Sequence, residues 1–179
     1  IDCELTDAVH REKSLELRDV LGLSERQILK NVILISVAFL ALFTSYVGLA
    51  TLQSSLHIQE GMGVINQCIV YAALCCSCLC LPKVTIRYLG HKWTMVVSML
   101  GYIFWMACNG YAIWATMVTA SIIVGLTAST LWTAQRVYIT IAAQKYAVYT
   151  RETADVVRSR FFGIFFGIYK LSKCDYFAD

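Results

Sequence analysis

The sequence predicts an all-α fold, a polytopic membrane helix bundle with four transmembrane helices and a partial fifth. Of the 179 residues, 58% are hydrophobic and 15% are charged, whereas a soluble domain has about 25% charged residues. The mean hydropathy is +0.62. Between residues 31 and 144, formal charges occur only at Glu60, Lys83, Arg87, Lys92 and Arg136. Long apolar blocks with charges at their borders are typical of membrane spans.

Residues 25–144 are predicted to hold four membrane spans, after a flexible cytoplasmic lead-in over residues 1–24. A span needs about 20 mainly apolar residues as a helix. The spans that satisfy this requirement are, in order, residues 31–51, 66–86, 93–114 and 116–136. Three tryptophans lie near predicted span ends, where aromatic side chains favour the membrane–water interface: Trp93, Trp114 and Trp132.

A capping motif indicates where the first helix begins. Ser24 is a candidate N-cap, and Gln27 follows it three residues later, which is the capping-box spacing. Leu23 and Ile28 flank this motif as the two members of a hydrophobic staple. We therefore expect a helix that begins at Glu25 and runs directly into the first span.

After the fourth span, residues 145–179 are predicted to form a cytoplasmic segment. The apolar run 161–171 within it has only 11 residues and is interrupted by Lys170. Because a run of this length is too short to cross a bilayer, we expect only a partial fifth helix there.

The distribution of Lys and Arg predicts the orientation in the membrane. Residues 1–30 contain five, the connection after the first span none, and the connection around residues 83–92 three. The third connection again has none, and residues 136–160 have five. Since cytoplasmic loops carry the excess of basic residues, both termini are predicted to be cytoplasmic. The pattern fits the plasma membrane or an endomembrane.

Four cysteines in the second span raise the question of a metal site or a disulfide. Cys75, Cys76, Cys78 and Cys80 point to different sides of a helix that turns about 100° per residue. Four thiolates spread in this way do not meet around one metal ion, and Cβ atoms that diverge cannot be bridged. We interpret the cysteines as small apolar side chains, with S-palmitoylation of Cys80 as an alternative. No metal or cofactor is expected.

Small and polar residues within the spans are candidates for helix packing or for a cavity wall. The fourth span repeats a small residue at every fourth position, a pattern that favours close helix packing. Arg136 is interpreted as a side chain that reaches the interface, with a functional counter-charge as the alternative. The full candidate set is Tyr46, Gly48, Gln53, Ser121, Gly125, Ser129, Thr133, Gln135 and Arg136.

The sequence lacks the signatures of catalysis and of nucleic-acid binding. His10, His57 and His91 are scattered, and no nucleophile-elbow, zinc-protease or phosphate-loop motif occurs. No basic face with interleaved aromatic residues is present, so no nucleic-acid partner is expected. The predicted spans contain no carboxylate, which argues against a self-contained proton-coupled pump. We expect a non-enzymatic protein whose surroundings are lipid and other membrane proteins.

Several stretches together resemble the Unc-93-like family of the major facilitator superfamily, with most similarity to its A-type branch. They are "LQSSL" (52–56), "YAAL" (71–74), "LGHKWTM" (89–95), "LWTAQRVYIT" (131–140) and "RFFGIFFGIY" (160–169). The resemblance implies the N-terminal portion of a twelve-span parent built from two six-span halves. It also assigns the basic loop between spans two and three to Lys83, Arg87, Gly90, His91 and Lys92, with Lys83 and Arg87 replacing the usual Gly and Asp.

The same resemblance implies a function. Members of this family are regarded as accessory subunits or trafficking partners of other membrane proteins, such as ion channels or receptors. An alternative is a secondary transporter of a small solute, and a second alternative is a truncated product without function. Lateral contact through the small-residue stripe on the fourth span is the mechanism expected for the accessory role.

Overall fold

The computed structural model describes residues 24–56, 62–110 and 113–174. These ranges form five helices and contain no strand, which confirms the all-α prediction. In chain order the helices are α2 (Glu25–Leu56), α3 (Met62–Cys78), α4 (Leu81–Cys108), α5 (Trp114–Thr150) and α6 (Ala154–Cys174).

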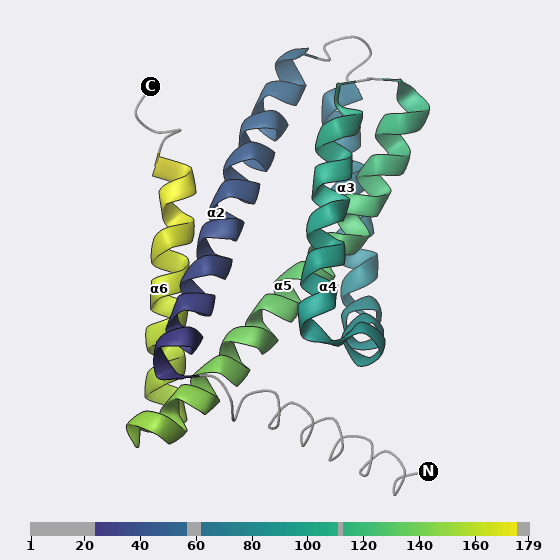
Figure 1. Ribbon diagram of the computed structural model, residues 1–179. Helices are drawn as coiled ribbons and strands as arrows, with labels where there is room; N and C mark the ends of the chain where they lie inside the picture. Colours follow the sequence, from purple (N-terminus) through teal and green to yellow (C-terminus); the bar gives the residue numbers. More distant parts are fainter. Residues whose placement is uncertain (1–23, 57–61, 111–112, 175–179) are drawn as a thin grey trace, which may run out of the picture.

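The long helix α5 holds the bundle together. Figure 1 shows α2 and α6 side by side on the left, α3 and α4 on the right, and α5 running diagonally between the two pairs. The most extensive contacts of α5 are with α4 and α3, and those of α2 are with α6. Each pair therefore packs against a different part of α5.

The first helix begins where the capping motif predicts. The backbone N–H of Ser24 donates to Oε1 of Gln27 at 3.0 Å, and α2 starts at Glu25. This bond is one half of a capping box. Leu23, the outer member of the predicted staple, lies outside the described residues, as does the rest of the lead-in before Ser24.

The second predicted span, 66–86, is wrong as a single helix. Helix α3 ends at Cys78, and α4 begins at Leu81 after a short turn. Pro82 lies in the first turn of α4. Proline lacks a backbone N–H and clashes inside a helix, but it is well tolerated in a first turn, so the chain restarts its helix here.

The last two helices are longer than predicted. Helix α5 continues to Thr150, so the segment predicted to begin at residue 145 starts inside this helix. Helix α6 has 21 residues rather than the predicted 11 over 161–171. Its first turns, before Phe161, carry polar side chains. They are helical but do not belong to the apolar run from which the prediction was made.

Among the described residues, two helices are long and apolar enough to cross a membrane individually, over Glu25–Gln53 and Trp114–Thr150. The segments Gly63–Cys78 and Leu81–Cys108 meet the same requirement only as a pair, with a bend of 78° between them. Length and composition thus give two spans, or three if the bent pair is one span. The four-span count remains a prediction.

Helix α4 is kinked at Gly90. The backbone of Gly90 has φ 73° and ψ 163°, a conformation that residues with a side chain rarely adopt. The buried Thr94 lies across the kink. Its Oγ1 donates to the carbonyl oxygen of Gly90 at 2.7 Å and lies 3.4 Å from that of Thr85. The kink therefore separates a short first segment of α4 from the longer remainder.

Replacing Gly90 with alanine is expected to lower the free energy of unfolding by about 1–3 kcal/mol, because a side chain strains this backbone conformation. No atom lies within 4 Å of a Cβ at this position, so crowding does not contribute. The measurement is thermal or denaturant unfolding of the protein in detergent micelles. Gly167→Ala on α6 is the matched control, since its Cβ also meets nothing within 4 Å. Equal stability of the two variants would contradict the strain.

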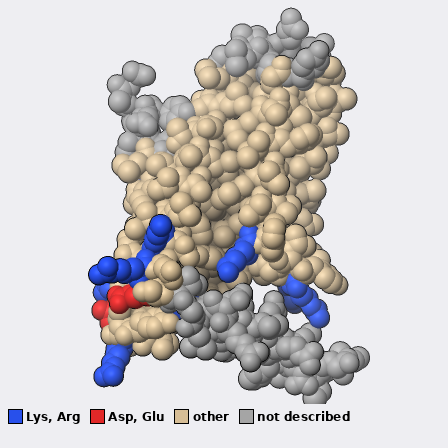
Figure 2. Space-filling model, viewed as in Figure 1, with Lys and Arg blue, Asp and Glu red and all other residues tan. Residues whose placement is uncertain are grey.

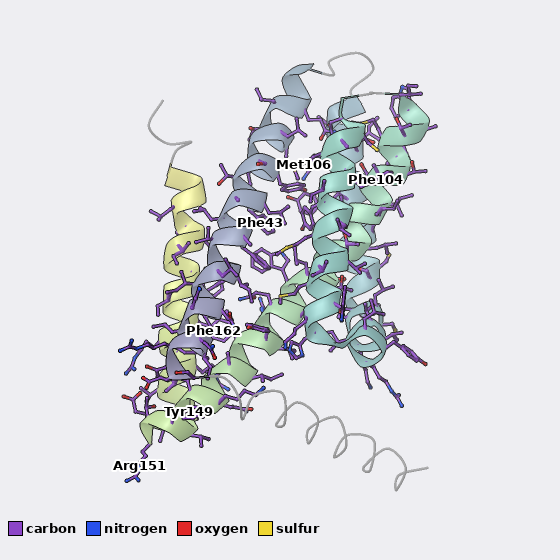
Figure 3. The ribbon with its side chains drawn as sticks, viewed as in Figure 1. Phe43, Phe104, Met106, Tyr149, Arg151 and Phe162 are labelled. Carbon is purple, nitrogen blue, oxygen red and sulfur yellow. The ribbon has the colours of Figure 1, made fainter. Side chains whose placement is uncertain are left out.

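An aromatic cluster joins the two helix pairs in the interior. It comprises Phe39, Phe43 and Tyr46 of α2, Tyr102 and Trp105 of α4, Trp132 of α5, and Phe165 and Tyr169 of α6. Phe43 is central, with ring centroids 5.2 Å from Trp132, 5.4 Å from Tyr169 and 5.5 Å from Tyr102. Figure 3 shows Phe43 projecting from α2 towards α4 and α5.

The charged side chains visible on one face lie in the lower half of the molecule (Figure 2). At this end Tyr146 of α5 donates its hydroxyl to Oε1 of Glu25 at 2.8 Å. Arg160 of α6 forms an ion pair with Glu152 at 3.2 Å. The described residues visible in the upper part of the same face are uncharged, as expected of a helical bundle immersed in lipid.

Candidate functional site

The small residues of α5 lie where α3 and α4 cross it. We call Ser121, Gly125, Ser129 and Thr133 the small-residue face. A Cβ at Gly125 would lie 2.5 Å from the carbonyl oxygen of Val70 and 2.6 Å from the Cβ of Ala73, both on α3. These distances are too short for a real side chain, so glycine is required for α3 to approach this closely.

Hydroxyl groups bond across the same crossing. Ser77 of α3 donates its Oγ to the Oγ of Ser129 at 2.7 Å, and Trp105 of α4 donates Nε1 to the Oγ of Ser121 at 3.4 Å. A third pair joins Ser98 and Thr130 at 2.8 Å. Polar groups in an apolar bundle need such partners, and here two neighbouring helices supply them.

The small-residue face therefore packs against helices of the same chain. Ser121, Gly125 and Ser129 are buried against α3 and α4. Thr133 is half-buried and donates its Oγ1 to the carbonyl oxygen of Ser129 at 2.9 Å. A partner protein could reach this face only after α3 and α4 had separated from α5, so the lateral contact predicted from it does not follow.

Removing the Ser77–Ser129 bond is expected to have a small but measurable effect. A double-mutant cycle with Ser77→Ala and Ser129→Ala should give a coupling energy of about 0.6 kcal/mol and no more than about 1.7 kcal/mol, the range for such bonds between membrane helices. The measurement is the free energy of unfolding in micelles. Ser45→Ala is the control, because Ser45 is exposed and its hydroxyl donates to the carbonyl oxygen of Ala41 in the same helix. Zero coupling between Ser77 and Ser129 would refute the interaction.

Three buried amides have no hydrogen-bond partner among the described residues. They are Gln53 near the end of α2, Asn66 near the start of α3, and Gln135 in α5. A buried amide left unpaired costs about 1–3 kcal/mol, so each native example calls for an additional group. These side chains can donate to and accept from water, a polar solute or another helix.

The remaining candidates of α2 and α5 occupy different environments. Tyr46 is half-buried, hydrogen-bonds the side chain of Gln67, and lies 5.0 Å from Trp105 between ring centroids. The carbonyl oxygen of Gly48 accepts from Thr51 at 2.9 Å. Arg136 is exposed. The structure thus brings the small-residue face together with α3 and α4, while Arg136 stays exposed.

The predicted basic loop is helical rather than open. We call residues 81–93, the first segment of α4 with the kink that ends it, the basic elbow. Lys83, Arg87 and Lys92 are exposed, and Gly90 forms the kink. The half-buried ring of His91 lies 5.6 Å from that of Tyr138 on α5. This ring contact attaches the basic elbow to the bundle.

The four cysteines of "CCSCLC" (75–80) are free and exposed. Ser77, the residue among them that the sequence analysis passed over, is buried and faces α5. Its polar side chain within an otherwise apolar, cysteine-rich run is the sequence feature that could have identified Ser77 as a packing residue. Trp105 and Asn66 were also missed, because only the packed bundle shows that Trp105 contacts Ser121 and that Asn66 is buried.

Comparison with known proteins identifies the family. A family model described as "Ion channel regulatory protein UNC-93" matches residues 54–169. The chain belongs to the UNC-93 family. The match begins in the last turn of α2 and extends almost to the end of α6, so it covers the helix crossing, the basic elbow and two of the three unpaired amides.

Individual relatives support the A-type branch of the UNC-93 family. "Protein unc-93 homolog A" of Bos taurus is 45% identical over 144 residues, which are 80% of this chain and 32% of the relative. The human homolog A is 40% identical over the same coverage, whereas human "Protein unc-93 homolog B1" is 27% identical over 135 residues. This difference confirms the resemblance predicted from the sequence.

A more distant relative carries a functional description in its name. "Putative potassium channel regulatory protein unc-93" of Caenorhabditis elegans is 36% identical over 144 residues, which are 80% of this chain and 20% of that protein. The chain spans about a third of the length of the homolog A relatives. It is a helical membrane protein of the UNC-93 family that corresponds to a part of those longer proteins.

Proposed function

We propose that the chain acts as a regulatory or accessory subunit of another membrane protein, with an ion channel as the first candidate and a potassium channel as the most specific one. The observation that carries this proposal is the match of residues 54–169 to a family described as ion channel regulatory. The name of the Caenorhabditis elegans relative supports the potassium channel. The proposed role is non-catalytic and could include assistance in trafficking.

The contact with a partner would be made through outward-facing apolar side chains. The small-residue face does not qualify, because α3 and α4 cover it. Apolar side chains are exposed elsewhere on the described helices, for example Val37 of α2, Leu100 of α4 and Ile123 of α5. Membrane helices associate by close packing of such surfaces rather than by the hydrophobic effect.

Site-specific photo-crosslinking in cells that co-express a potassium channel tests this proposal. A photoreactive residue placed at Val37, Leu100 or Ile123 is expected to trap the channel from at least one position, and co-expression is expected to change the potassium current. The same residue at buried Leu131 is the control and should give no crosslink. An unchanged current and the absence of any crosslink to the channel would reject the channel as partner.

We further propose that α2, α3, α4 and α5 all cross the membrane, with the N-terminus in the cytoplasm. The alternation of basic and uncharged connections supports this orientation. The predicted cytoplasmic C-terminus does not fit this arrangement, because α6 runs beside α2 in the same direction (Figure 1), with Phe165 next to Phe39 and Tyr169 next to Phe43.

An epitope tag inserted after Gln59 is expected to be reachable only from the non-cytoplasmic side. A tag after Arg151 should be reachable only from the cytosol. The reverse result at either position would reject the orientation.

A second candidate function is transport of a small polar solute, which the unpaired amides of Gln53, Asn66 and Gln135 favour. In transporters of this superfamily the substrate binds between the repeats near the membrane centre. The two functions differ in a liposome assay. Flux of a solute that Gln135→Leu abolishes would support transport, whereas no flux together with capture of a channel would support the regulatory role.

A further inference from the structure

We propose that the basic elbow is an interfacial helix that binds the anionic headgroups of phospholipids in the membrane leaflet that it faces. This proposal goes beyond regulation of a channel, because it assigns a ligand and a site to residues 81–93. It rests on the geometry of the segment, on the division of its surface into stripes, and on its charge.

The geometry turns the basic elbow away from the direction of α3. The chain bends by 78° between the helices on either side of Cys80. Gly90, with its positive φ, then separates the segment from the rest of α4. A short helix between two such bends connects one membrane-crossing direction to the next, which is the position of an interfacial helix.

The surface of the segment is divided into three stripes along the helix. Pro82, Thr85 and Ile86 are buried or half-buried and face the bundle. Lys83 and Arg87 are four residues apart and form an exposed basic stripe. The exposed apolar stripe consists of Leu81, Val84 and Tyr88. A helix with a basic and an apolar exposed side can place its cations among headgroups while the apolar side contacts acyl chains.

Charge complementarity identifies the ligand as anionic. Lys83, Arg87 and Lys92 have no ion pair among the described residues, whereas Arg158 and Arg160 are paired with Asp155 and Glu152. The sequence has no acidic residue between Glu60 and Glu152. Within the part of the chain that the structure describes, these three cations thus meet no carboxylate.

Two aromatic side chains support a headgroup as the source of the negative charge. Tyr88 and Trp93 are among the most exposed large side chains, at 80% and 68% of their surface. Such amphipathic rings favour the headgroup level of a bilayer. An aqueous phosphate would be bound by the cations alone, whereas a phospholipid also satisfies the exposed rings and the apolar stripe.

The experiment is native mass spectrometry of the full chain in detergent, titrated with phosphatidylserine or phosphatidylcholine. Each basic residue near an anionic surface contributes about a fivefold gain in affinity. We therefore expect the first phosphatidylserine to bind at least about tenfold more tightly than phosphatidylcholine, and the triple variant Lys83→Gln, Arg87→Gln, Lys92→Gln to reduce this preference to about twofold or less.

The control removes the same number of charges elsewhere, through Arg151→Gln, Arg158→Gln and Arg160→Gln, and should keep the preference. A preference that survives in the elbow variant, or that both triple variants lose equally, would overturn the proposal. If the elbow variant fails to fold, Lys83→Gln and Lys92→Gln are tested singly, and each is expected to lower the preference severalfold. Equal displacement of the lipid by inorganic phosphate at the lipid's concentration would also overturn it.

Discussion

Replacing Gly125 with leucine is expected to separate α3 from α5 and to cause the largest loss of stability of any single substitution discussed for this chain. A Cβ alone would lie 2.5 Å from the carbonyl oxygen of Val70, and a backbone atom cannot rotate away as a side chain can. Overpacking in a dense interior costs about 1–3 kcal/mol and at times more. Because leucine adds three further carbons at this crossing, we expect at least about 3 kcal/mol.

The measurement is the unfolding midpoint in micelles, together with the fraction of protein that elutes as a single species. Gly163→Leu on α6 is the matched control, since no atom lies within 4 Å of its Cβ, and it should keep the parental midpoint. A Gly125→Leu protein as stable as the control would show that α3 does not pack on α5 in this way. Lost association with a channel in this variant would therefore report a damaged bundle and not a missing contact face.

Phe43→Ala is expected to have the second largest effect, because it empties the centre of the aromatic cluster. The ring of Phe43 contacts aromatic rings from all three other helices of the cluster, with centroid distances of 5.2–5.5 Å. Truncating a buried phenylalanine costs about 3–5 kcal/mol in soluble cores. In lipid the hydrophobic term between helices is missing, so we expect about 2–3 kcal/mol from lost packing and the cavity.

Phe104→Ala is the control for this substitution. Phe104 is exposed and lies on the side of α4 opposite to Met106, which faces α2 (Figure 3). It should change the unfolding free energy by no more than about 0.5 kcal/mol. The readout is denaturant unfolding followed by tryptophan fluorescence, to which Trp132 beside Phe43 contributes. Equal losses in the two variants would contradict a central role for Phe43.

The features that depend on local sequence could be predicted. The low content of charged residues gave the all-α membrane class, and the Ser24–Gln27 spacing gave the first residue of α2. Short motifs between residues 52 and 169 gave the family. Pro82 could have predicted the break between α3 and α4. The break was missed because the residues around it are apolar, so hydropathy alone does not mark it.

The features that depend on how the helices pair could not be predicted. The fourfold spacing of Ser121, Gly125 and Ser129 predicts a close neighbour, but nothing in that spacing identifies it as α3 and α4 rather than another protein. The burial of Gln53, Asn66 and Gln135 likewise depends on which helices surround them. A sequence period gives the face of a helix, while the identity of the neighbour depends on tertiary structure.

The pairing of α2 with α6 also sets an order of events during synthesis. Helix α2 leaves the ribosome before α6, yet its most extensive contacts are with that helix. At about 5–20 residues per second, α6 follows on the order of ten seconds later. For that interval Phe39 lacks Phe165, its nearest ring, so the aromatic cluster is completed only after α6 has been synthesised.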